Sequence, residues 1–212
     1  MTEEQIQKNK EEFIALCREH IQRDGLEDLL AYLEKTDFYT APSSTAFHLN
    51  EDGGLCRHSI NVFQTARTLL EQYVAPAKAE GRLNSDKEIS LESVAVCTLF
   101  HDLCKVNLYK KVDKFKKDEN GRWVTYPGYE VEDKFPFGHG EKSCFAIMHY
   151  MKMLPDEMLA VRWHMGMFDL APQGCAQSYA FKAALEKSPL VALVHSADFL
   201  SSNLLEKTKK YK

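Results

Sequence analysis

The chain of 212 residues carries 27 lysines and arginines against 31 acidic residues, which gives a net charge of −4. This balance excludes a generally basic protein that binds nucleic acids or membrane surfaces through excess positive charge. Its 44% hydrophobic content is enough for one sizeable core. No apolar stretch approaches the roughly 18 residues of a membrane span, and the first residues lack a signal-peptide pattern, so we expect a soluble, cytoplasmic protein with no membrane partner.

The first part of the chain predicts a helical hairpin. Apolar residues recur at helical spacing through residues 3 to 34 and are interrupted at Asp24-Gly25. We therefore expect residues 1 to 35 to pack as a helical hairpin on a main domain of residues 36 to 212. Residues 36 to 54 are irregular, and a mixed loop of this length is often functional.

The main domain is predicted to be helical with one inserted hairpin. Helical periodicity resumes at Leu55, and residues 91 to 106 are apolar almost all round, which predicts a buried central helix. Within residues 108 to 137, lysine-rich and aromatic-rich segments flank Asn120-Gly121, a pattern typical of a β-hairpin. Further helices are expected at about 140 to 153, 155 to 165 and 176 to 187, and after residue 189. The predicted class is all-α with an inserted β-hairpin.

The predicted central helix ends in LFHDLCK, which places His101 beside Asp102. A buried carboxylate beside an imidazole is costly unless a cation compensates it. A divalent metal is an economical candidate, because both side chains are metal ligands and a carboxylate can bridge two ions. Lys105 can point to the same side and hold a phosphate oxygen. The alternative is that His101 and Asp102 form a hydrogen-bonded pair at a helix end.

Two other segments offer partners for this pair. In the last predicted helix, His195 and Asp198 stand at i and i+3 in an apolar stretch, so a second carboxylate is expected to be buried. In GGLCRHSINVF, His58 lies one turn into a helix with an apolar stripe. His58 is either a metal ligand or a core histidine whose hydrogen bonds are satisfied.

The order of these residues, H…HD…D, resembles that of the HD-domain metal-dependent phosphohydrolases over about residues 45 to 203. GGLCRHSINVF and VHSAD also resemble segments of the HD domain of 3′-to-5′ exoribonucleases and their relatives. The resemblance implies an HD-domain helical bundle. The chain has no room for the separate oligonucleotide-binding barrel of those enzymes, so we expect a small phosphorylated substrate such as a nucleotide, and favour short RNA or DNA less.

Two further histidines bear on the number of ions. His139 lies in PFGHGEKS and His164 in VRWHMGMFD. Family members with two extra histidines between HD and the final aspartate hold two metals. The resemblance thus implies one ion on His58, His101, Asp102 and Asp198, and another on Asp102, His139 and His164. These ligand types do not choose among manganese, iron, magnesium, nickel and cobalt. The alternative is that these two histidines bind no metal. His139 would then be a loop residue, and His164 would interact with the dipole at the C-terminal end of a helix.

Other residues are candidates for substrate contacts. His48 matches a histidine that faces the site in such relatives, although it could equally be an exposed loop residue. Arg162 and Asp169 flank His164 and could orient substrate or ligands, or be surface charges. The lysine-rich strand, followed by Trp123 and Tyr126, could form a lid that offers charge to phosphate and a ring to a base, or a solvated hairpin. The expected catalytic residues are Asp102, Lys105 and Arg162.

The expected reaction is hydrolysis of a phosphomonoester or phosphodiester by water activated between two metal ions. Lys105, and less strongly Arg162, would stabilise charge on the phosphoryl group. One alternative is an HD-type diiron oxygenase, which uses the same six-ligand set. Another is a non-catalytic HD module that senses a nucleotide; such modules usually have a broken ligand set, whereas all six positions are intact here.

Overall fold

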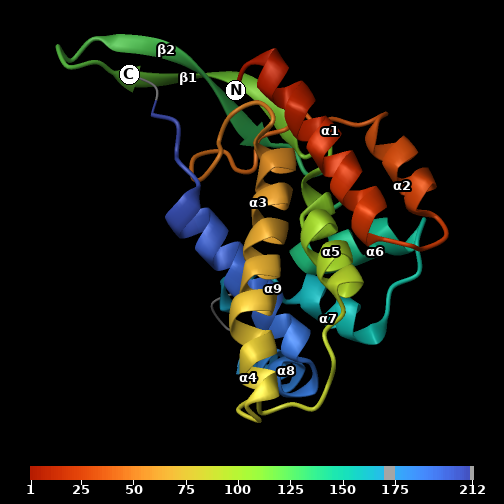
Figure 1. Ribbon diagram of the computed structural model, residues 1–212. Coiled ribbons are helices and arrows are strands. Elements are labelled where there is room, and N and C mark those ends of the chain that lie inside the picture. The colour runs from red at the N-terminus through yellow and green to blue at the C-terminus, as the bar shows by residue number, and fades with distance from the viewer. Residues whose placement is uncertain (170–174, 211–212) are drawn as a thin grey trace.

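The computed structural model describes residues 1–169 and 175–210 and is mostly helical, with one two-stranded antiparallel sheet (Figure 1). The expectation of a mainly helical fold that carries a β-hairpin is confirmed. Within these residues, no helix combines the length and the apolar character that crossing a membrane requires.

The helices are grouped around a common core, and two of them continue into π-helical turns. The turn Leu70–Val74 joins α3 to α4, and Ser201–Leu205 follows α9. Short 3-10 turns are formed by Leu103–Lys105 and Gly166–Asp169. The helices are α1 (Glu3–His20), α2 (Leu26–Leu33), α3 (Gly54–Leu69), α4 (Ala75–Ala79), α5 (Leu91–Phe100), α6 (His139–Met148), α7 (Pro155–Arg162), α8 (Cys175–Lys187) and α9 (Pro189–Leu200).

The N-terminal helix shares the core of the main body. Thr2 and Gln5 form a capping box that starts α1, since each side chain bonds to the backbone N–H of the other residue. The Phe13 ring of α1 is fully buried and lies 4.9 Å from the Phe38 ring and 5.8 Å from the Phe100 ring, centre to centre. Helix α1 therefore packs on α3 and α5.

The central helix is α5, which packs against α1, α3, α7 and α9. Every residue from Ser93 to its end is buried, as its apolar sequence predicts. The predicted extension of this helix to residue 106 is wrong, because α5 ends at Phe100 and Asp102 adopts φ −104° and ψ 21°. Side chains replace the next helical hydrogen bonds: the Thr98 carbonyl accepts from His101 Nδ1 at 2.7 Å, and Cys104 N donates to Ser143 Oγ at 3.0 Å.

The hairpin consists of β1 (Tyr109–Lys117) and β2 (Trp123–Val131), in register from Tyr109↔Val131 to Lys117↔Trp123. Asp118 caps the turn by accepting from two backbone N–H groups, and Gly121 supplies the positive φ of 77°. Asp52 anchors the base of the hairpin, because it accepts from Lys111 Nζ at 2.9 Å and from the Tyr129 hydroxyl. Figure 1 shows the hairpin at one end of the helical body, next to the C-terminal segment.

A buried ion pair fixes the turn after α1 to the main body. The Glu157 carboxylate on α7 is fully buried and accepts from Arg23 Nη1 at 2.7 Å and from Nη2 at 2.6 Å. It also accepts from Ser93 Oγ at 2.7 Å and from Leu154 N at 2.8 Å. One carboxylate thus connects the α1–α2 turn with α5 and α7.

Replacing Arg23 by alanine should therefore destabilise the protein. The loss of the guanidinium leaves the Glu157 carboxylate buried without its cation. We expect the free energy of unfolding to fall by about 2 to 4 kcal/mol. This is less than for a wholly buried ion pair, because Arg23 is partly exposed to solvent. Urea unfolding measures the change. The matched control is Arg18→Ala, which removes an exposed partner of Glu27 and should barely move the midpoint. Equal midpoint shifts in the two variants would contradict this role.

Candidate metal centre

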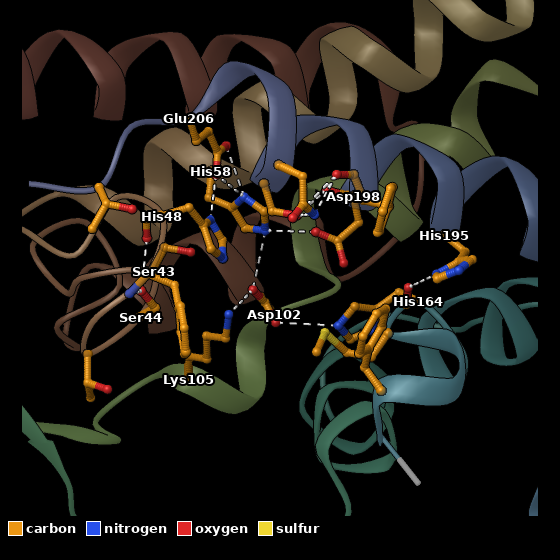
Figure 2. Close-up of a pocket in the computed structure, with 18 of the residues that line it drawn as sticks. Ser43, Ser44, His48, His58, Asp102, Lys105, His164, His195, Asp198 and Glu206 are labelled. Atoms are coloured by element: carbon orange, nitrogen blue, oxygen red, sulfur yellow. Dashed lines mark hydrogen bonds and ion pairs between the residues drawn. The ribbon is translucent and has the colours of Figure 1, made fainter.

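The six predicted ligands lie together, although they come from separate parts of the chain. His58 lies on α3, Asp198 lies on α9, and His139 is the first residue of α6. His101 and Asp102 occupy the turn after α5, and His164 lies two residues beyond α7. Figure 2 shows His58, Asp102, His164 and Asp198 pointing toward one another.

The first set of ligand atoms surrounds His58. Its Nε2 lies 3.1 Å from His101 Nε2, 3.2 Å from Asp198 Oδ1 and 3.5 Å from Asp102 Oδ2. Asp102 Oδ2 also lies 3.4 Å from His101 Nε2. An octahedral ion with ligands at about 2.1 Å keeps adjacent ligand atoms about 3 Å apart, so this spacing fits one cation.

The second set faces the other oxygen of Asp102. Asp102 Oδ1 lies 2.9 Å from His139 Nε2 and 3.5 Å from His164 Nε2. The two oxygens of one carboxylate therefore face two different groups of imidazoles. This is the arrangement expected of a carboxylate that bridges two cations.

The hydrogen bonds of the imidazoles leave Nε2 available for a metal. His101 Nδ1 and His164 Nδ1 each donate to a backbone carbonyl at 2.7 Å, those of Thr98 and Val161. A neutral imidazole that donates through Nδ1 carries its lone pair on Nε2. Among the described residues, the buried His164 Nε2 has no hydrogen-bond partner. An unsatisfied buried acceptor beside a carboxylate fits a bound cation, and these groups can hold metal ions.

The electrostatics of the cluster favour positive charge. Burial raises the pKa of Asp102, but Lys105 and His101 outweigh it and hold that pKa well below its usual range. Burial also raises the pKa of Asp198, and the hydrogen bond from His58 outweighs it. Burial lowers the pKa of His58, whereas Glu206 and Asp198 raise it to about 10 overall. Both aspartates are therefore ionised, and without a metal a protonated His58 and Lys105 supply the positive charge that compensates them.

Glu206 is a residue of this site that the sequence analysis missed. Its buried carboxylate accepts from His58 Nδ1 at 3.0 Å, from His48 Nδ1 at 2.6 Å and from Asn61 Nδ2 at 2.8 Å. The bond to His58 fixes the tautomer whose Nε2 faces the centre. No local spacing in SSNLLEKTKKYK marks Glu206, because it reaches the site only when the C-terminal segment folds back.

Lys105 lies where it was predicted, beside the aspartate. Its Nζ donates to Asp102 Oδ2 at 2.6 Å, and its side chain lines the pocket over the centre (Figure 2). Burial lowers its pKa, but Asp102 raises it above the usual value. The pocket thus contains a charged ammonium held in place at the metal centre.

Cys104 was also missed as a neighbour of the centre. Its Sγ lies 3.3 Å from His139 Nδ1, and with Asp102 it completes another group able to hold an ion. Burial raises the pKa of this thiol, so without a metal it is neutral.

Other predicted contacts are not in the pocket. Arg162 pairs through Nε with Glu141, its guanidinium lies 4.2 Å from the Trp163 ring centre, and it does not line the pocket over the centre. Trp123 is 69% exposed and does not line the pocket, because its strand turns it away from the body. Tyr126 lines a separate pocket, and the side chain of Asp169 lies outside the described part of the chain.

The pocket over the centre has a volume of about 740 Å³. This lies within the range of about 300 to 1,000 Å³ that is typical of small-molecule sites. His48 lines it, as do several hydroxyl-bearing residues and three phenylalanines. The latter are Phe47, Phe168 and Phe199.

No protein-family model matches the chain, and comparisons with curated proteins and with solved structures give no match. The nature of the centre must therefore be argued from its own contacts. The strongest of these are the shared carboxylate, the imidazole tautomers and the adjacent ammonium.

Glu206→Gln should weaken metal binding without unfolding the protein. A neutral amide is a poorer acceptor for His58 Nδ1–H, and loss of such a partner lowers metal affinity by about 10- to 100-fold. Calorimetric titration with Mn²⁺ measures the change, and circular dichroism checks the helical content. Glu71→Gln, at an exposed position, is the control and should bind like the wild type. Unchanged affinity in Glu206→Gln would show that His58 does not depend on this carboxylate.

Proposed function

We propose that the protein is a binuclear metal-dependent phosphohydrolase or phosphodiesterase of the HD-domain type, acting on a nucleotide or another small phosphoester. The observation that carries this proposal is the environment of Asp102, whose oxygens face two groups of imidazoles while Lys105 donates to the same carboxylate. The resemblance of the H…HD…H…H…D order to that family supports it independently.

The chain's own residues would divide the ligands between two sites. One ion would be held by His58, His101, Asp102 and Asp198, and the other by Asp102, His139 and His164. Two divalent ions in these positions would polarise phosphoryl oxygens and lower the pKa of water. Manganese, iron, magnesium, nickel and cobalt all suit a mixed shell of histidine and carboxylate.

Lys105 would bind the phosphoryl group of the substrate. Its ammonium is held beside the centre by Asp102, so it needs no large movement to donate to a phosphoryl oxygen. A preorganised charge in a buried site stabilises the negative charge that develops in the transition state far better than the same charge in water. The hydrogen bond that His58 Nδ1 donates to Glu206 would keep His58 in its ligand orientation during this step.

The walls of the pocket suit a small phosphorylated molecule with a ring. The aromatic side chains Phe47 and Phe168 at the pocket are each 74% exposed in the protein. A base that stacks on such rings would cover them, whereas the ligands and Lys105 would face the phosphate. This combination supports a nucleotide as the substrate class.

Asp102→Ala should abolish metal binding and hydrolysis together. The change removes the carboxylate that both groups of ligands share, while α5 and its neighbours keep their packing. The measurements are metal content, phosphate release from a panel of nucleotides, hydrolysis of bis(p-nitrophenyl) phosphate with added Mn²⁺, and circular dichroism. Arg162→Gln is the control, because Arg162 does not line the pocket, and it should keep both properties.

Other results would contradict the proposal in distinct ways. Hydrolysis retained by Asp102→Ala would exclude a metal-dependent hydrolase centred on this residue. Two bound irons with oxygen uptake and no hydrolysis would favour an HD-type diiron oxygenase. Metal-loaded protein that binds nucleotides tightly without turning them over would favour a sensing module.

A further inference from the structure

A second pocket lies beside the metal pocket, between the hairpin and the body. Its volume is about 210 Å³. It is lined by Thr45, Ala46, Asn50, Lys114, Lys116, Tyr126, Gly128 and Lys209. Three lysines and no carboxylate line this pocket, although the chain as a whole is net negative. Such a local excess of positive charge suits an anion.

The hairpin turns these lysines toward the body. Directly opposed residues of two strands share a face, so Lys114, Lys116 and Tyr126 lie on one face, and their side chains are half-buried. Phe115 and Trp123 lie on the other face and are 66% and 69% exposed. Tyr126 shares the inner face with the two lysines, so this face offers the pocket both ammonium groups and an aromatic ring.

Neighbouring groups hold the two strand lysines in place. Lys114 passes over Gly128, where an added Cβ would lie 2.8 Å from its Cδ, and Lys116 Nζ lies 5.6 Å from the Tyr126 ring centre. In the described part of the chain, no carboxylate forms an ion pair with Lys114 or Lys116, whereas Lys111 pairs with Asp52. Lys209 Nζ, by contrast, lies 3.3 Å from Glu51 Oε2. Lys114 and Lys116 are therefore the two lysines of the pocket that no described carboxylate pairs with.

The two pockets share a wall. Thr45 lines both of them, and the C-terminal segment contributes Glu206 and Thr208 to the metal pocket and Lys209 to the second. Two hydrogen bonds fix this segment to the loop: Leu49 N donates to the Lys207 carbonyl at 3.0 Å, and Lys209 N donates to the side-chain Oδ1 of Asn50 at 2.7 Å. Thr45 and the C-terminal segment thus place the two pockets next to each other.

We propose that the pocket of Lys114, Lys116 and Lys209 binds a second phosphate group of a substrate whose reacting phosphate lies at the metal centre. The inference rests on the proposed function and narrows its substrate class to molecules with a polyphosphate chain, such as nucleoside polyphosphates. Phosphate oxygens accept charge-assisted hydrogen bonds from ammonium groups, and lysine is a common phosphate ligand. Asn50 and Tyr126 also line this pocket.

The first test measures binding without catalysis. Inorganic tripolyphosphate is titrated calorimetrically into the full chain in the presence of a chelator, with wild type compared with the Lys114→Gln, Lys116→Gln double variant. Because a hydrogen bond to a charged group contributes about 1.5 to 3 kcal/mol, we expect binding at least about tenfold weaker in the variant. The matched control is Lys117→Gln with Lys134→Gln, which removes the same charge at exposed positions and should bind nearly as wild type.

The second test uses the metal-loaded protein. For a nucleoside triphosphate, the inner-face double variant should raise KM with kcat little changed, while the kinetics with a nucleoside monophosphate stay as in wild type. Tripolyphosphate binding that depends on these lysines, in a protein with no hydrolase activity, would support the anion site and refute only the proposed function. Equal binding by the inner-face variant and the control would overturn the anion site. Lysine-dependent binding of a short oligonucleotide but not of tripolyphosphate would overturn the polyphosphate class.

Discussion

The arrangement of the candidate metal centre depends on the buried carboxylate of Asp102. Removing an ionised carboxylate from water costs several kcal/mol, so it must be surrounded by compensating groups. Here Lys105 Nζ lies 2.6 Å away, and imidazoles from α3, α6 and the turns after α5 and α7 approach within 3.5 Å. The elements that form the core are the same ones that bring these groups together. The packing of these helices therefore also positions the groups that compensate the charge of Asp102.

Outside this centre, a second layer of hydrogen bonds determines how the imidazoles point. Backbone carbonyls of Thr98 and Val161 hold two of them, and Glu206 holds a third. His195 Nδ1 donates to the His164 carbonyl at 2.7 Å, which ties that turn to α9. Ligand orientation is thus set by the fold before any ion binds, and such preorganisation is what a functional site on rigid elements requires.

Much of this arrangement was predictable from the sequence, because apolar periodicity marks helices and Asn120-Gly121 marks the hairpin turn. The ligand positions were expected as a set from the resemblance in their order, and folding brings them together. The end of α5 at Phe100 was missed because side chains compete with helical hydrogen bonds there. The contact of Glu206 with His58 depends on segments far apart in the chain. Strand alternation predicts that Lys114 and Lys116 share a face, but only tertiary packing decides which face meets the body.

The most direct test of the central claim is an anomalous difference map from crystals of the protein reconstituted with Mn²⁺. The account predicts two peaks, one on each side of Asp102: the first among His58, His101 and Asp198, and the second beside His139 and His164. A single peak, or peaks away from Asp102, would contradict a centre in which this carboxylate bridges two ions.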